Sequence, residues 1–275
     1  MEAFSTTLAA MGRASTAPHH PILTTNHLPP SEKKMKEQRQ FEIELVPWDA
    51  TDGAHVKRLI AQREACTWAE DEVPSWRELM IRGVKTIFWI ALTDDSPMRE
   101  VMLRTHFHEF PKELEPLLDT SPTMAANART PSARPFHPVG HVALEALPDR
   151  NARFGLPRAT YWVKSLYISW PLQFSGLGSA AMSHLERIAS NPPFNSEYIA
   201  LDTLPASFQR SDEVQSIAFD ARGIPRPQEM RTNEEWFRRM GYRVIGADQR
   251  LYRRFDPVSG AEVAMPGLFF KKALR

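Results

Sequence analysis

The sequence predicts a mixed α/β fold, of the α+β kind, built on one mixed sheet. Two observations predict it. Short runs rich in β-branched and aromatic residues, typical of strands, alternate with segments whose apolar residues recur at helical spacing. The 275 residues can bury one substantial core, and no segment is repeated. We therefore expect the element order β, α, α, β, β, β, α, β, α, β, β.

Composition limits the function classes. The formal net charge of +1 leaves no basic face for nucleic acid. The single cysteine, Cys66, excludes an internal disulfide and is consistent with a reducing compartment. No apolar run approaches the ~18 residues that cross a bilayer. We expect a soluble cytoplasmic or nuclear protein, without a membrane or nucleic-acid partner.

The chain divides into a tail and one domain. Residues 1–39 are rich in Ser, Thr, Pro and His and lack both periodicities, which predicts a disordered tail. Residues 40–275 are expected to form a single domain with insertions at about 93–138 and 204–231. Long irregular segments of this kind are often functional.

Helices and strands alternate in the first half of the domain. Ser75 with Glu78 forms a capping-box pattern, which predicts the start of the second helix. In the first insertion we expect one short helix, at 111–118. The elements expected in this half are a strand at 41–46, a helix from Asp52 to Trp68, a helix from Ser75 to Gly83, and strands at 86–92 and 139–147.

The second half is organised around a glycine turn between a strand and a helix. The acidic residue Glu235 behind Thr232 predicts another capping box. The elements expected here are a strand at 160–169, a helix at 179–189, a strand at 198–203, a helix from Thr232 to Gly241, and strands at 242–245 and 267–271.

The glycine turn predicts an anion site. Gly176 and Gly178 lack a Cβ, so another group can come close to their backbone. A turn that opens a helix presents unpaired N–H groups at the positive end of the helix dipole, where phosphate is the usual ligand.

Two known patterns fit this turn. Residues 176–181 match the dinucleotide fingerprint G-x-G-x-x-A, with Asp202 near the spacing of its acidic residue. Residues 173–178 equally match Q/R-x-x-G-x-G/A, an acyl-CoA pyrophosphate loop. In a dinucleotide fold the first glycine follows its strand almost directly, whereas residues 169–175 intervene here, and too little chain follows Asp202 for further βαβ units. Spacing therefore favours the acyl-CoA loop.

With that loop and element order, residues from about Phe41 to Lys271 resemble the GNAT superfamily of N-acetyltransferases. The strand residues 166–168 and 198–201 and the segment 236–242 add to the resemblance. It implies that the strands ending at Ile168 and starting near Tyr198 splay apart and that the pantetheine arm of acetyl-CoA lies in the gap. The residues that it implies for binding acetyl-CoA are Leu166, Tyr167, Ile168, Gln173, Phe174, Ser175, Gly176, Leu177, Gly178 and Ser179.

The resemblance also implies a reaction, in which a neutral amine attacks the thioester carbonyl. The N–H of Leu166 is expected to donate to the developing oxyanion. A carboxylate or imidazole must take the amine's proton. The candidates are Glu145 and His141, which share one face of their strand. Trp162 and Lys164 hold the positions where family members often place a base, and neither is a plausible base in ordinary form.

One residue departs from the family pattern. Four residues before the glycine that ends the last helix, family members commonly carry a tyrosine that protonates the departing thiolate. Phe237 stands there in this chain and has no proton to give. A tyrosine general acid at this position is excluded.

The sequence therefore predicts an acetyl-CoA-dependent N-acyltransferase acting on a small-molecule or peptide amine, with acetyl-CoA as co-substrate and no metal. Two alternatives stay open. A non-catalytic acyl-CoA-binding module of the same fold would fit Phe237. An NAD(P)-binding oxidoreductase would fit the G-x-G-x-x-A pattern.

Overall fold

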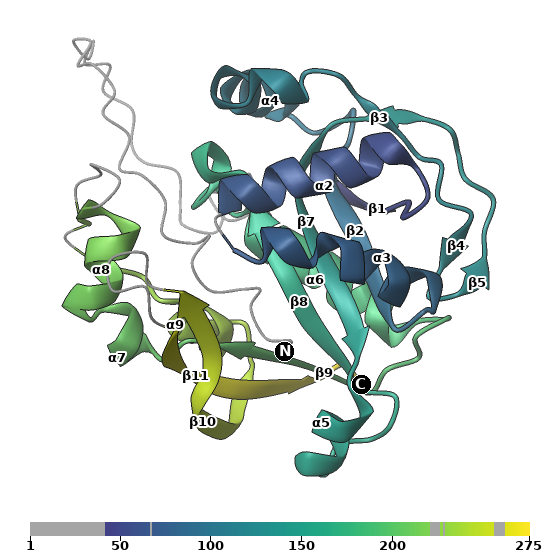
Figure 1. Cartoon of the computed structure of the whole chain (residues 1–275). Coiled ribbons are helices and arrows are strands. Elements are labelled where there is room, and N and C mark those ends of the chain that lie inside the picture. Colours follow the sequence, from purple (N-terminus) through teal and green to yellow (C-terminus); the bar gives the residue numbers. More distant parts are fainter. Residues whose placement is uncertain (1–41, 67, 221–225, 228, 256–261) are drawn as a thin grey trace, which may run out of the picture.

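A seven-stranded mixed sheet forms the centre of the computed structural model (Figure 1), which describes residues 42–66, 68–220, 226–227, 229–255 and 262–275. The strand order is β1-β2-β7-β8-β9-β11-β10. Neighbours pair antiparallel except for the parallel pair β8 and β9. The strands are β1 (Ile43–Pro47), β2 (Lys85–Leu92), β7 (Pro138–Ala146), β8 (Tyr161–Ile168), β9 (Tyr198–Thr203), β10 (Arg243–Phe255) and β11 (Glu262–Ala273). The mixed α/β fold predicted from the sequence is confirmed.

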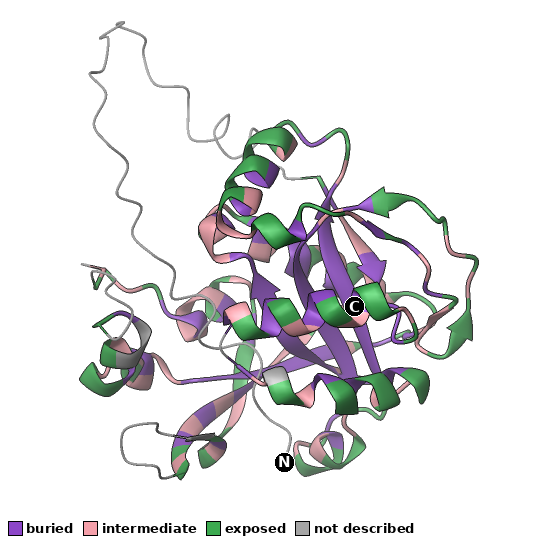
Figure 2. Ribbon diagram, turned by 45° about the horizontal axis from the view of Figure 1, so that its top comes forward, coloured by how far each residue is buried: buried purple, intermediate pink, exposed green. Residues whose placement is uncertain are grey.

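Helices cover both faces of the sheet, so its central strands β2, β7, β8 and β9 are buried, whereas β10 and the outer surfaces of the helices carry exposed residues (Figure 2). On one face, α2 (Gly53–Cys66) and α3 (Val73–Ile81) pack on alternate strand residues such as Trp89 and Ala143. On the other, α6 (Leu177–Ser190) packs on their neighbours, such as Val142 and Leu166. We call these the α2 face and the α6 face.

The remaining short elements lie around this centre. A helix not expected from the sequence, α5 (Pro148–Arg153), precedes β8, and α9 (Asn233–Arg239) precedes β10. The other elements are η1 (Glu70–Glu72), α4 (Arg99–Glu109), η2 (Pro111–Glu113), β3 (Leu117–Leu118), β4 (Thr123–Met124), β5 (Asn127–Ala128), β6 (Pro135–Phe136), η3 (Trp170–Leu172), α7 (Ala206–Gln209) and α8 (Asp212–Ala218).

A β-bulge in β8 shapes the middle of the sheet. His141 pairs with Tyr167 and Ala143 with Lys164, so one residue of β7 faces two of β8. Ser165, one of these two, has φ +53°. A bulge of this kind adds a residue and bends its strand. Beyond it the alternation is restored, with Tyr167 on the α2 face and Ile168 on the α6 face.

The bent strand leaves its parallel neighbour. β8 pairs with β9 only through residues 161–163, the last pair being Val163 with Leu201, although both strands continue further. We call the point beyond this pair the fork. The splay implied by the sequence resemblance is present in the structure, and β8 has no β9 partner from Lys164 to Ile168.

Several local predictions were wrong. The second helix begins at Val73 rather than after Ser75, because proline is tolerated in a first helical turn, and the Ser75 hydroxyl donates to the Glu72 carbonyl. The predicted helix at 111–118 is only the turn η2. The helix of the first insertion is α4 instead. Its buried residues are Met102, Leu103 and His106, and so few buried positions give no apolar periodicity from which a helix can be predicted.

The second insertion is less irregular than predicted, since it contains α7 and α8, the latter capped by Ser211. The last two strands, expected over four and five residues, extend over 13 and 12. The capping box of Thr232 and Glu235 is confirmed. The predicted tail, residues 1–39, lies outside the described residues.

Candidate functional site

The glycine turn adopts the geometry of an anion-binding loop at the start of α6. Gly176 is the residue before the helix and has φ +108°, a conformation that L side chains rarely adopt. The first main-chain bond of α6 runs from Ala180 N–H to the Gly176 carbonyl. The amides of the first turn before Ala180 have no partner within the helix, because a helix leaves its first N–H groups unpaired.

Two side-chain hydrogen bonds order the loop, one to the end of β8 and one to η3. Gln173 donates from Nε2 to the Ile168 carbonyl oxygen at 3.0 Å. The Ser175 hydroxyl donates to the Leu172 carbonyl at 2.6 Å. These bonds hold Gly176 and the first turn of α6 beside the open edge of β8.

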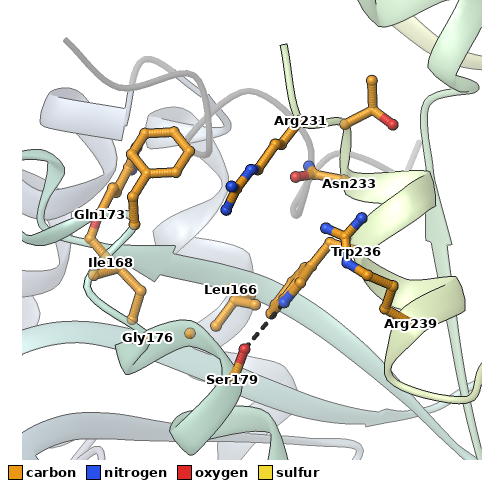
Figure 3. Close-up of a pocket in the computed structure, with 12 residues that line it drawn as sticks. Leu166, Ile168, Gln173, Gly176, Ser179, Arg231, Asn233, Trp236 and Arg239 are labelled. Atoms are coloured by element: carbon orange, nitrogen blue, oxygen red, sulfur yellow. Dashed lines mark hydrogen bonds between the residues drawn. The ribbon is translucent and has the colours of Figure 1, made fainter. Parts of the chain in front are cut away.

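A cavity of about 260 Å³ lies between this loop and α9 (Figure 3). One side, which we call the loop wall, consists of Gln173–Ser179. The other, the helix wall, consists of Arg231–Arg239. The Trp236 indole N–H donates to the Ser179 hydroxyl at 3.1 Å and joins the two walls. The described lining residues are Leu166, Ile168, Gln173, Phe174, Gly176, Gly178, Ser179, Arg231, Thr232, Asn233, Trp236 and Arg239.

The charge of the cavity is positive. Arg231 and Arg239 line it, and none of the described lining residues is acidic. Arg231 extends from the helix wall toward the loop wall (Figure 3). Neither guanidinium forms an ion pair with a residue that the structure describes. Two guanidinium groups that line a cavity at a helix N-terminus favour a ligand with several negative charges.

Most of the residues expected to bind acetyl-CoA meet in this cavity. Seven of the ten line it, namely Leu166, Ile168, Gln173, Phe174, Gly176, Gly178 and Ser179. Ser175 has the supporting role described above. Leu177, the first residue of α6, is fully buried in the core, and Tyr167 packs on the α2 face with Cys66 and Trp68.

The helix wall was not predicted as part of the site. The sequence predicts Thr232 only as a helix start and Trp236 only as part of the segment 236–242 that adds to the resemblance, and it predicts no role for Arg231 or Arg239. Phe237 is fully buried and packs against Tyr242 and Phe270 rather than lining the cavity. Its neighbour Trp236 occupies the cavity side of the helix.

The predicted proton acceptors, Glu145 and His141, lie on the α2 face and outside the cavity lining. Glu145 is buried and forms an ion pair with Lys85. His141 is fully buried, and burial followed by the Arg63 charge holds its pKa well below the usual value. Gln62 donates its amide nitrogen to Glu113 and Pro138, so its oxygen accepts from His141 Nδ1. His141 is therefore a neutral imidazole.

Asp202, the residue that would bind a ribose in a dinucleotide fold, is engaged elsewhere. It is 2% exposed and pairs with Lys164 at 2.6 Å and Arg150 at 2.7 Å. The Tyr252 hydroxyl donates to its other oxygen at 2.7 Å. A doubly wound dinucleotide fold also needs a mostly parallel sheet, whereas one pair of neighbours is parallel here. Both observations disfavour the oxidoreductase alternative.

Within the described residues, no group of three or more His, Cys, Asp or Glu side chains is arranged to hold a metal ion. None of the described helices has the length and apolar character of a membrane span.

Comparison with known proteins gives matches in structure only. No protein-family model matches the sequence, and no curated protein does. An aminoglycoside 6'-N-acetyltransferase complexed with coenzyme A matches at 12% identity, over 84% of this chain and 97% of its own, with TM-score 0.45. RimL, a ribosomal L7/L12 alpha-N-protein acetyltransferase, matches at 10% identity, over 85% and 94%, with TM-score 0.42.

A GNAT-family acetyltransferase from Staphylococcus aureus matches at 10% identity, over 85% of this chain and 99% of its own, with TM-score 0.41. The assignment of the site rests on the strand register, the loop and the cavity described above.

Proposed function

We propose that this chain is an N-acetyltransferase that moves an acetyl group from acetyl-CoA to an amine. One observation carries the proposal: a positively charged cavity at a helix N-terminus opens directly onto the unpaired edge of β8. Coenzyme A combines the two matching features, a polyanionic nucleotide and an extended arm with two amides. The loop wall and the two arginines would hold the phosphates.

The pantetheine arm would occupy the open edge of β8. An edge strand without a partner presents N–H and C=O groups that need hydrogen bonds. An extended ligand with amides can supply them in the manner of an added strand. Leu166 and Ile168 lie on this edge and line the cavity, so their backbone groups are the proposed partners of the arm.

The proposed reaction is direct attack of a neutral amine on the thioester. A C–N bond forms, the C–S bond breaks, and the electron pair leaves with the CoA thiolate. The Leu166 N–H is the proposed donor to the oxyanion. Since a primary amine is mostly protonated near neutral pH, a group on the protein must accept its proton. Glu145 and His141 stay predictions for this role.

A non-catalytic acyl-CoA-binding module is the second candidate function. Phe237 favours it, because its ring cannot protonate a thiolate and is buried away from the cavity. Both functions require binding of acyl-CoA, but only the transferase would release CoA in the presence of an amine.

Calorimetry and a turnover assay test both candidates. We expect acetyl-CoA to bind at micromolar concentration and NADP to bind at least tenfold more weakly. In the turnover assay, free thiol is followed with acetyl-CoA and a panel of polyamines, aminoglycosides and peptides with free N-termini. Amine-dependent thiol release supports the transferase. Tight binding without release for any amine would support the binding module, and equal affinity for NADP would refute both.

A further inference from the structure

Lys164 occupies the fork, on the face opposite the cavity. It is the first residue of β8 beyond the last pair with β9, and it pairs with Ala143 on the α2 face. Its Nζ lies 2.6 Å from Oδ2 of Asp202, the first residue of β9 beyond the same pair. Both side chains are buried, with 5% and 2% exposure. The contact between Lys164 and Asp202 therefore crosses the gap where the two strands begin to separate.

The charges around Lys164 balance when its amine is neutral. Arg150, from α5, donates to the same Asp202 oxygen at 2.7 Å, and Tyr252, from β10, donates its hydroxyl to the other oxygen. One carboxylate thus serves two cations. Glu145 faces the group from β7, but Lys85 pairs with it. A protonated Lys164 would be a second cation on this one carboxylate, next to its buried oxygen, which is costly.

The ionisation of Lys164 follows from this arrangement. Burial lowers its pKa. The Asp202 charge and hydrogen bond and the Glu145 charge oppose the change, and the Arg150 charge reinforces it. Asp202 keeps a lowered pKa, since its cations and hydrogen bonds outweigh the cost of burial. A lysine that loses its proton here leaves behind a complete Arg150–Asp202 ion pair.

The reactive end of acetyl-CoA would reach the fork. Ile168 lies beside the start of α6, where an added Cβ on Gly178 would be 3.9 Å from Ile168 Cγ1. The arm from diphosphate to sulfur has roughly thirteen chain atoms, the length of about four extended residues or about 14 Å. Four residues back along β8 from Ile168 is Lys164.

We propose that neutral Lys164 is the proton acceptor for the attacking amine, an inference that rests on the proposed function. The amine nitrogen bonds to the thioester carbon and passes its proton to Lys164 Nζ. The C–S bond breaks, and its electron pair leaves with the thiolate, which takes a proton from solvent. Lys164 then returns its own proton to solvent. Asp202 and Arg150 position the amine group and set its charge.

The other two candidates on this face are occupied. The Glu145 carboxylate is neutralised by Lys85. His141 donates from Nδ1 to Gln62, and its Nε2 faces Arg63 Nη1 at 3.4 Å. Glu145 and His141 lie on β7, away from the open edge of β8 that the pantetheine arm would follow. Lys164 is the first residue of that open edge.

Lys164→Arg tests the proposal, because arginine can still pair with Asp202 but carries a permanent positive charge and cannot act as a proton acceptor. Lys85→Arg is the matched control, a second buried lysine paired with a carboxylate on the same face. We expect Lys164→Arg to slow amine-dependent thiol release at least 100-fold with unchanged acetyl-CoA affinity, the usual range for a lost general base. Lys85→Arg should change the rate less than threefold.

The pH dependence provides a readout that a structural role would not change. The wild-type rate should rise with pH through the Lys164 pKa and then level off, and this rise should disappear in Lys164→Arg. If Glu145→Gln removes the rise and Lys164→Arg keeps it, Glu145 is the acceptor and the proposal is wrong.

A direct titration needs neither an acceptor amine nor a folded variant. In protein labelled with ¹⁵N-lysine, the Lys164 Nζ resonance should change from the ammonium to the amine position below the usual pKa of about 10.4. A Lys164 that stays an ammonium up to pH 10 would overturn the inference and leave the acetyl-CoA site untouched. Failure of wild-type protein to bind acetyl-CoA would instead refute the proposed function.

Discussion

The two walls of the cavity offer a ligand different groups. The loop wall, Gln173–Ser179, presents backbone amides whose positions are fixed by Gly176 and by hydrogen bonds to the end of β8 and to η3. The helix wall, Arg231–Arg239, presents two exposed, unpaired guanidinium groups on long side chains. Rigid amides give directional contacts, whereas exposed side chains give charge that salt screens. The loop wall should therefore decide whether a ligand binds, and the helix wall how tightly.

Gly176→Glu should have the largest effect. The new side chain would strain a residue at φ +108° and place a carboxylate where the phosphates are proposed to bind. We expect the acetyl-CoA affinity to fall at least 1,000-fold in calorimetry, while circular dichroism shows a folded chain. An affinity within tenfold of wild type would show that the loop wall is not the phosphate site.

Replacing both arginines of the helix wall should have an intermediate effect. Each charge-assisted contact to phosphate is expected to contribute roughly 1.5 kcal/mol, about tenfold in affinity. Arg231→Ala with Arg239→Ala should weaken acetyl-CoA binding 30- to 100-fold and reduce its dependence on salt. Arg238→Ala is the control, since Arg238 pairs with Glu234 and does not line the cavity. An unchanged salt dependence in the double variant would contradict the assignment of the helix wall.

The two walls also differ in how far the sequence predicts them. The loop wall lies within a few residues of β8 and α6 in the sequence. The spacing of its glycines therefore predicts the backbone geometry of the turn. The helix wall depends on a contact between Ser179 and Trp236, which are 57 residues apart. No local pattern indicates that Arg231 and Arg239 would face the loop.

The fork shows the same limit. The splay was expected from resemblance, but the bulge at Ser165 that produces it has no sequence signal, because a positive φ on serine reflects tertiary context. From its residue type alone, Lys164 is not a plausible base, because a lysine is ordinarily protonated near neutral pH. Its pairing with Asp202, 38 residues later, and the second cation on the same carboxylate give it an unusual environment. Charge balance of this kind requires the three-dimensional arrangement.

Phe174→Gly should separate stability from binding within the loop wall. Phe174 has φ +62° and its side chain is 65% exposed, so neither backbone nor packing explains the ring. A left-handed conformation costs an L-residue roughly 1–2 kcal/mol, which glycine avoids. We expect the free energy of unfolding to rise by about 1 kcal/mol and acetyl-CoA affinity to fall three- to tenfold. A more stable variant with full affinity would remove the ring from the site.

Thr232→Ala should have the smallest effect on binding, and it tests whether the helix wall needs an ordered start. Thr232 accepts from the Glu235 N–H, and the Glu235 carboxylate accepts from the Thr232 N–H, so the residue fixes the turn between Arg231 and α9. Losing a cap costs about 1 kcal/mol, to be measured by urea denaturation. Because the arginines reach the ligand through flexible side chains, we expect affinity to change less than threefold. A loss as large as that of the double arginine variant would show that the helix wall, like the loop wall, depends on a fixed backbone.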